Sequence, residues 1–382
     1  MLSILNLPLW CLIVVVLPLV YARPSSYALW GADSAIARGQ GHGLDSSGNP
    51  LLLYEHGELQ WALRLLYERT GNETYYNYIK TGVDNVVDSN GNVGGGYSAT
   101  QFQLDPLRVG PTFLYLYNQT KQAKYKAAAD EFRAQLPINS RTAQGQFWHK
   151  KVDPDQDNIT AWDDIISQFV LMYNNTIQTA APPDHTFTGL LYHGYDYSHT
   201  AVWADPDRGH SPEIWIRAVG WYSMALVDLL SIIPTSHPGH KIILSYIQTL
   251  FPRIVSAADP TSGVWWLVMT QPGRAGNYFE SSGSAMFVYS LLKAVRLGYL
   301  CDSDGKVVAA AKKAYQYMVD NWVVDHGDGT MDWNNTVLVG SLDPSSNGSF
   351  EYYVGIPIDL NDLKGVAAFV LASIEFEQLS SK

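Results

Sequence analysis

Apolar and polar positions along this chain follow the period of amphipathic helices, and the predicted helices come in pairs. The stretches Tyr67–Tyr75 and Tyr117–Tyr125 share one layout, in which a helix ends, a short polar turn follows and a second helix begins. In both stretches a second tyrosine closes the pattern at the same offset. The two stretches lie about 50 residues apart, a spacing typical of stacked units of two helices.

The same pattern predicts helices along the rest of the chain. The longest apolar one begins with Ser211 as N-cap and Pro212 in its first turn. Beyond the two hairpins above, the predicted helices cover residues 27–38, 159–173, 212–233, 240–258, 284–300, 306–322 and 363–378. Long loops rich in glycine and aromatic residues follow the second helix of each pair, and short strand signals lie inside them. Such loops gather at one end, which favours an all-α fold closed into a barrel over an open solenoid with polar caps.

The N-terminal residues predict export from the cell. An apolar run from Leu2 to Val20 is followed by small residues that offer a cleavage point. We predict a signal peptide at residues 1–22 and a single secreted domain at residues 23–382. A membrane anchor is the alternative, since the run is long enough to span a bilayer. Six N-x-Ser/Thr sequons indicate a glycoprotein, and they start at Asn72, Asn118, Asn158, Asn174, Asn334 and Asn347.

Charge and composition narrow the class of ligand. The formal net charge is −11 and no basic run occurs, which argues against nucleic acid. Aromatic residues make up 13% and charged residues only 16%, which favours carbohydrate binding over a solvated interaction scaffold. The histidines show no metal-ligand spacing with one another or with Cys301, and Gly94–Gly96 lacks the lysine of a phosphate loop. We predict no metal, no cofactor, no membrane partner and a monomeric protein.

Candidate chemistry is densest between Gly189 and Tyr222. Rigid indoles alternate there with a few ionisable groups, which suits a sugar ring with apolar faces and polar edges. The arginine makes a uronic acid plausible, because a guanidinium binds a carboxylate in a bidentate way. Alternatively, these tryptophans form core and the arginine pairs with a structural carboxylate. The residues concerned are His193, Asp196, Trp203, Trp215, Arg217 and Trp221.

Several motifs together carry a resemblance to a known family. They are Phe147-Trp-His-Lys-Lys151, Thr188-Gly-Leu-Leu-Tyr-His-Gly-Tyr-Asp196, Trp203-Ala-Asp-Pro206, the run from Ser211 to Tyr222, Ser284-Ala-Met-Phe287 and Asn361-Asp-Leu-Lys-Gly365. The chain resembles the unsaturated rhamnogalacturonyl hydrolases of glycoside hydrolase family 105, which are related to the unsaturated glucuronyl hydrolases of family 88. The resemblance covers nearly the whole chain after residue 22.

The resemblance implies an (α/α)6 barrel of six helical hairpins and a role in pectin degradation. The implied enzyme removes the 4,5-unsaturated uronic acid that lyases leave on the non-reducing end of rhamnogalacturonan oligosaccharides. Protonation of the vinyl ether at C4 and addition of water at C5 then release the neighbouring sugar. By resemblance, Asp105 is a catalytic carboxylate, and the residues that line the sugar pocket are Tyr54, His149, His193, Trp215, Arg217, Trp221 and Lys364.

One segment of the family pattern is missing. In the family a Met-Trp-Leu-Asp-Gly run, with the proposed acid/base aspartate, follows the Trp-His-Lys-Lys loop. Here the sequence passes from Gln156 directly to Asp157 and an outer helix, so eleven helices are predicted where six pairs need twelve. One hairpin therefore lacks its inner helix, of roughly 15 residues. Either the gene model is defective, or the chain is a catalytically dead homologue that still binds carbohydrate. Asp153, Asp155 or Asp157 could replace the lost acid.

Individual residues keep competing interpretations. Asp105 suits an N-cap before Pro106 as well as the site. His193 and Asp196 share a turn, so their pairing could fix the imidazole tautomer. Arg217 and Trp221 share a helix face, whereas Trp215 joins them only if the helix start is irregular. Trp265, Trp266, Tyr352 and Tyr353 suit sugar platforms or packing. A third class of protein with such a barrel is the terpene cyclases, but the sequence has no Asp-rich metal-binding motif that would support this class.

Overall fold

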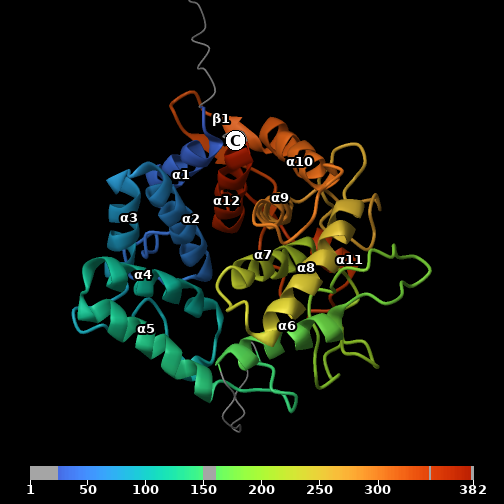
Figure 1. Ribbon diagram of the computed structural model, residues 1–382, viewed down its shortest axis with the longest axis horizontal. Coiled ribbons are helices and arrows are strands. Elements are labelled where there is room, and N and C mark those ends of the chain that lie inside the picture. Colours follow the sequence, from blue (N-terminus) through green and yellow to red (C-terminus); the bar gives the residue numbers. More distant parts are fainter. Residues whose placement is uncertain (1–24, 149–160, 344–345, 380–382) are drawn as a thin grey trace, which may run out of the picture.

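The computed structural model describes residues 25–148, 161–343 and 346–379. Within these ranges, eleven helices of 11 to 19 residues build the body of the molecule (Figure 1). Their number agrees with the sequence prediction, and several bounds agree closely. The helix predicted at residues 306–322 is α10 (Lys306–Trp322), and the one predicted at 363–378 is α12 (Leu363–Leu379).

The helices form an inner and an outer layer. Neighbouring inner helices α2, α12, α9 and α7 pack side by side, and α4 lies next to α2 (Figure 1). Each inner helix also packs against an outer one, which gives the pairs α12–α1, α2–α3, α4–α5, α7–α8 and α9–α10. The inner helices are α2 (Tyr54–Thr70), α4 (Gly110–Thr120), α7 (Ile216–Leu230), α9 (Ser281–Arg296) and α12. The outer ones are α1 (Tyr27–Ala37), α3 (Glu73–Asp84), α5 (Ala123–Gln135), α6 (Ala161–Thr176), α8 (Pro238–Ser256) and α10.

Among the described residues, no inner helix lies between α4 and α7. The outer helix α6 packs against α8 and has no inner partner of its own within the described ranges. Residues 149–160 lie outside these ranges, so the absence of an inner helix stays a prediction. The acidic start of α6 agrees with the sequence, because Asp163 and Asp164 stand in its first turn, where negative charge favours the helix dipole.

Two glycines let α7 and α9 approach closely. A Cβ atom at Gly220 would lie 2.6 Å from Sδ of Met286, and one at Gly283 would lie 2.5 Å from Cγ1 of Ile216. Any larger side chain at either position would push the two inner helices apart. Helix α9 is buried along nearly its whole length, so this contact is central to the core.

Helix α7 begins at Ile216, and the predicted start at Pro212 is wrong. The backbone N–H of Ile216 donates to the carbonyl of Leu267, and Met269 donates to Ile214. These bonds hold the residues before α7 in an extended conformation, with Trp215 bridged to Val268. Non-local pairing therefore outweighs the local signal of Ser211 and Pro212.

The remaining regular elements are short and lie in the loops, as predicted. Strand β1 (Val323–Asp325) pairs antiparallel with β2 (Met331–Trp333), and β3 (Thr336–Val337) pairs with β4 (Ile358–Asp359). Helix α11 (Phe350–Val354) precedes β4, and the 3-10 helices are η1 (Ala99–Gln101), η2 (Asp105–Val109) and η3 (Leu136–Ile138).

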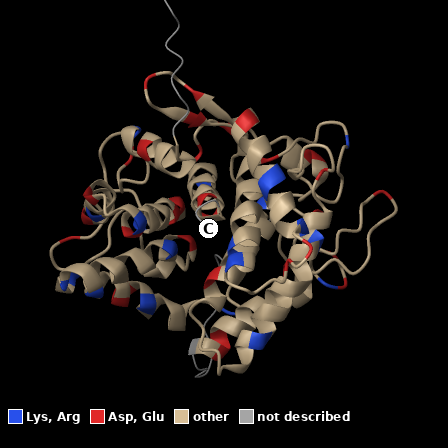
Figure 2. Ribbon diagram, turned by 45° about the horizontal axis from the view of Figure 1, so that its top comes forward, with Lys and Arg blue, Asp and Glu red and all other residues tan. Residues whose placement is uncertain are grey.

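Acidic and basic positions are scattered over the ribbon, most of which carries neither (Figure 2). Among the residues that the structure describes, no helix is both long and apolar enough to cross a bilayer. The predicted signal peptide falls on residues 1–22, which lie outside the described ranges.

Candidate active site

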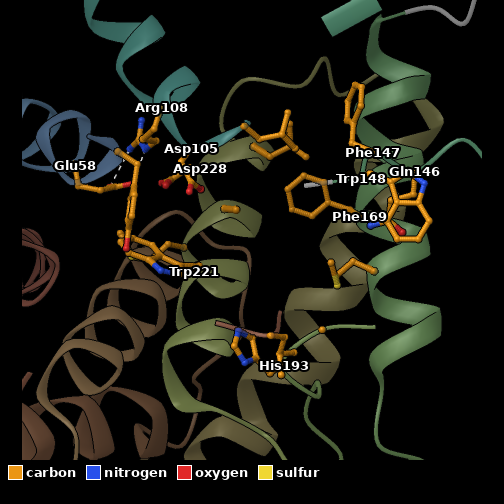
Figure 3. A pocket seen from close by; sticks show the side chains of 18 of the residues that line it. Glu58, Asp105, Arg108, Gln146, Phe147, Trp148, Phe169, His193, Trp221 and Asp228 are labelled. Atoms are coloured by element: carbon orange, nitrogen blue, oxygen red, sulfur yellow. Dashed lines mark hydrogen bonds and ion pairs between the residues drawn. The ribbon is translucent and has the colours of Figure 1, made fainter. Parts of the chain in front are cut away.

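A cavity of about 1810 Å³ lies on the inner side of the helix ring and is lined by residues of α2, α4, α6 and α7, among others. It is larger than the usual 300–1,000 Å³ of a small-molecule site. Its wall includes Tyr54, Asp105, His193 and Trp221 of the predicted site, together with Asp196 and Trp203 (Figure 3). The fold thus brings part of the predicted set of site residues to one cavity.

Aromatic and acidic groups meet at the junction of α2, η2 and α7. Tyr54 opens α2 and meets Trp221 of α7 edge to face, with ring centroids 6.0 Å apart. Asp105 is the first residue of η2, and the preceding Leu104 takes the N-cap position without a side-chain bond. Burial raises the pKa of the Tyr54 hydroxyl, so this phenol stays protonated and can donate a hydrogen bond.

His193 is held by aromatic neighbours. Its Nδ1 lies 2.6 Å from the hydroxyl oxygen of Tyr353, and its ring centroid lies 4.6 Å from that of Trp215. Burial, together with the charge of Arg217, lowers the pKa of His193 to about 3. The imidazole is therefore neutral at any ordinary working pH.

The predicted pairing of His193 with Asp196 is wrong. Both carboxylate oxygens of Asp196 accept bonds from its own loop, from the backbone N–H groups of Ser198, Thr200 and Ala201 and from the Ser198 hydroxyl. These bonds outweigh the effect of burial and lower the pKa of Asp196. The aspartate thus shapes the turn, and Tyr353 takes the partner position on the imidazole.

Arg217 and Trp215 lie behind the cavity wall. Arg217 is 1% exposed, and its Nη2 donates to the backbone carbonyl oxygens of Val337 and Leu338. The same atom lies 3.7 Å from a carboxylate oxygen of Glu280, whose side chain is fully buried. The guanidinium also stacks over the Trp215 ring at 4.9 Å. Arg217 and Glu280 therefore form the structural ion pair that the sequence offered as an alternative. Contact of Arg217 with a uronate stays a prediction.

Two further predicted site residues are placed differently. Lys364 is the second residue of α12, is 5% exposed, pairs with Asp362 at 2.6 Å and is not among the residues that line the cavity. His149 lies outside the described residues, as do Asp153, Asp155 and Asp157. Of the aromatic residues with open roles, Trp265 packs in the core and donates from Nε1 to the carbonyl of Ile254.

Sequence reasoning missed a second polar cluster that lines the same cavity. Arg108 of η2 forms a two-point ion pair with Glu58 of α2, at 2.5 and 3.0 Å (Figure 3). Asp228 of α7 accepts from Nζ of Lys293 at 2.5 Å, and burial still raises the pKa of this carboxyl. Trp61 lies between the two cations, 4.9 Å from the guanidinium and 5.4 Å from the ammonium group.

A positional signal for this cluster is present in the sequence. Glu58 stands one turn after Tyr54, and Asp228 stands two turns after Trp221 on the same helix face. Charged residues at such offsets from pocket residues are expected to face the same cavity.

Residues 37–380 match the profile of Glycosyl Hydrolase Family 88. The chain belongs to this family. It is therefore a glycoside hydrolase, and the predicted barrel of helical hairpins is confirmed by solved structures of the same architecture.

Three relatives show how far the similarity reaches. A family 105 glycoside hydrolase from C. acetobutylicum superposes with a TM-score of 0.84 at 31% identity, over 92% of this chain and 99% of that one. Protein Atu3128 of Agrobacterium fabrum is 36% identical over 192 residues, which are 49% of this chain and 82% of that protein. The unsaturated rhamnogalacturonyl hydrolase YesR of Bacillus subtilis is 26% identical over 249 residues, 60% of this chain and 67% of that enzyme.

The part of the chain that the structure describes contains no group of three or more histidine, cysteine or acidic side chains arranged to hold a metal ion. The ionisable groups on the cavity wall are carboxylates, one neutral imidazole and paired cations. This set is suited to proton transfer and to hydrogen bonding with a polar ring.

Proposed function

We propose that this hydrolase removes the 4,5-unsaturated uronic acid from the non-reducing end of lyase-generated rhamnogalacturonan oligosaccharides. The observation that carries the proposal is that Asp105, neutral His193 and the Tyr54–Trp221 pair line one cavity. Family membership supports the reaction class, and the YesR relative supports the rhamnogalacturonan substrate.

In the proposed reaction the carboxyl group of Asp105 takes over the role of the family's acid/base aspartate and delivers a proton to C4 of the double bond. Positive charge then develops at C5 and the ring oxygen, and a water molecule adds at C5 while its proton passes to the Asp105 carboxylate. The resulting hemiketal opens to a ketone and leaves C1 as a hemiacetal, which releases the neighbouring sugar as an alcohol. The indole of Trp221 offers an apolar face to the sugar ring, and the Tyr54 hydroxyl donates to its edge.

The test is an absorbance assay on rhamnogalacturonan that a lyase has digested, because the reaction removes the conjugated double bond. We expect the wild-type protein to bleach this absorbance and Asp105→Asn to lose at least about 100-fold of the rate, the usual contribution of a positioned proton donor. Asp130→Asn, on the exposed face of α5, is the matched control and keeps the wild-type rate. Equal rates for both variants would overturn the assignment of Asp105.

The gap in the family pattern after Gln156 favours a second candidate function, that of a binder without turnover. The family's acid/base aspartate belongs to the segment that is missing after Gln156. Binding of the unsaturated oligosaccharide without loss of absorbance, measured by calorimetry, would identify this case. A transcript with additional codons between Gln156 and Asp157 would instead show that the chain lacks one inner helix through a defective gene model.

Secretion and glycosylation form part of the proposal. The five sequon asparagines that the structure describes are all exposed: Asn72, Asn118, Asn174, Asn334 and Asn347. Exposure is a condition for carrying a glycan, so their placement supports an extracellular protein that acts on pectin fragments.

A further inference from the structure

Tyr353 reaches the cavity region from a part of the chain that no motif of the site includes. It lies on the short helix α11, whose start is capped by the Ser349 side chain. The side chain is fully buried, and its ring stacks on Trp215 with centroids 5.9 Å apart and an interplanar angle of 19°. Its hydroxyl oxygen lies 2.6 Å from Nδ1 of His193, 160 positions away in the sequence.

The burial of Tyr353 settles which group donates in this bond. A phenol that burial keeps protonated must place its O–H on an acceptor, and Nδ1 of His193 is the only hydrogen-bond partner of this hydroxyl among the described residues. Tyr353 is therefore the donor and Nδ1 the acceptor. A neutral imidazole that accepts at Nδ1 carries its proton at Nε2.

The other ring nitrogen is available to a ligand. His193 lines the cavity, and in the described part of the chain its Nε2 has no hydrogen-bond partner. Nor does Nε2 count among the enclosed polar atoms that lack a partner, so it is open to the cavity. The side chain therefore presents a neutral N–H donor to whatever occupies the cavity.

We propose that Tyr353 is a positioning residue, which holds His193 in the Nε2–H tautomer so that the neutral imidazole donates a hydrogen bond to an oxygen of the unsaturated sugar. This inference rests on the proposed function for the identity of the ligand, whereas the tautomer itself is a property of the free protein. Trp215 supports the arrangement from behind, since its ring contacts both His193 and Tyr353.

The packing around Tyr353 limits its freedom to move. A Cβ atom at Gly340 would lie 3.4 Å from the Tyr353 ring and 3.4 Å from the Trp215 ring. The loop that carries Gly340 therefore closes against the edge of both aromatic rings. With its ring confined in this way, the hydroxyl keeps one direction and the imidazole keeps one orientation.

The experiment uses the full-length protein with ¹⁵N-labelled histidine. Long-range proton–nitrogen spectra distinguish the two neutral tautomers and the imidazolium. We expect the wild-type His193 signal to show a protonated Nε2, and Tyr353→Phe to shift it toward a mixture of tautomers. The same variant should raise KM roughly three- to tenfold, the effect of one weakened hydrogen bond, with a smaller change in kcat.

Tyr352→Phe is the matched control. It removes the neighbouring hydroxyl of α11, which contacts only the backbone of Ser341 among the described residues, and should leave the His193 spectrum unchanged. In a His193→Gln background, where an amide N–H replaces Nε2–H, adding Tyr353→Phe should cause no further rise in KM. A purely structural role of Tyr353 would instead add its full effect in that background.

Two results would overturn the inference. One is a wild-type spectrum with the proton on Nδ1, and the other is a Tyr353→Phe spectrum identical to that of the wild type. If the spectra behave as expected while no substrate is turned over, the tautomer assignment stands and the proposed hydrolase function fails.

Discussion

The buried pair of Arg217 and Glu280 gives a stability prediction that separates the two interpretations of this arginine. Arg217→Met removes the guanidinium and leaves a fully buried carboxylate without its cation. Breaking a buried pair in this way usually costs about 3–5 kcal/mol of unfolding free energy. Here the lower end applies, because Nε and Nη1 of Arg217 are themselves buried without a partner among the described residues. We expect a loss of about 3 kcal/mol.

The loss is partly offset by the partners that remain on Glu280. Its carboxylate also accepts from the backbone N–H of Gly283 at 2.7 Å and from the Ser282 hydroxyl at 2.8 Å, and so caps α9. In Glu280→Gln, the amide oxygen of the new side chain can keep one of these two bonds. The double variant Arg217→Met/Glu280→Gln should therefore be more stable than the sum of the two single changes predicts, since the pair is coupled.

Urea unfolding followed by circular dichroism measures these differences. The matched control is Arg274→Met, which breaks the exposed pair with Glu351 and should leave the unfolding midpoint nearly unchanged. The reasoning is refuted if Arg217→Met unfolds at the wild-type midpoint while KM for the unsaturated oligosaccharide rises more than about tenfold. That outcome would mean that Arg217 binds the uronate directly.

Three further predictions follow from other parts of the molecule. Burial acts to raise the pKa of Asp164, but the two bonds and the charge of Arg141 lower it overall, so its stabilisation is present at neutral pH and is lost as the pH falls through the folded-state pKa. Asp164→Asn should therefore destabilise the protein at pH 7, by about 1 kcal/mol after solvent screening, and its difference from the wild type should shrink as acid denaturation curves are measured at pH values progressively below the pKa of the unfolded carboxyl. The pKa of His193, lowered to about 3, predicts no histidine limb near pH 6.5 in the rate profile, and a limb there that disappears in His193→Gln would contradict it. Enzymatic removal of N-glycans should increase the gel mobility of the secreted protein, and replacing the exposed Asn118 by Gln should reduce that change by one step.

Helical periodicity was enough to predict the architecture. The helix at residues 306–322 has a strongly amphipathic pattern, and α10 has these same bounds. The start of α7 was mispredicted because Ser211 and Pro212 carry a genuine local signal that a distant segment overrides. The backbone of residues 267–269 pairs with that of residues 214–216, and no local rule contains this pairing.

Residue chemistry predicted the composition of the site better than its geometry. Asp105, His193 and Trp221 were expected in one pocket and line one cavity. The partner of His193 was mispredicted, because the nearest candidate in the sequence, Asp196, satisfies its carboxylate within its own turn. Its actual partner comes from α11, and such long-range contacts are invisible to arguments from spacing.

The site is built in two layers, and the layers predict different consequences of mutation. The side chains that face the cavity, including Asp105, His193 and Trp221, can change turnover with little effect on the core. Arg217 and Tyr353 lie behind them and are almost completely buried, so we expect them to act on the substrate through the orientation of other groups. For each substituted residue, the ratio of lost unfolding free energy to lost substrate affinity therefore indicates in which of the two layers the residue lies. Between α4 and α7, where the described residues contain no inner helix, an added helix that supplies a second layer should increase stability and turnover together.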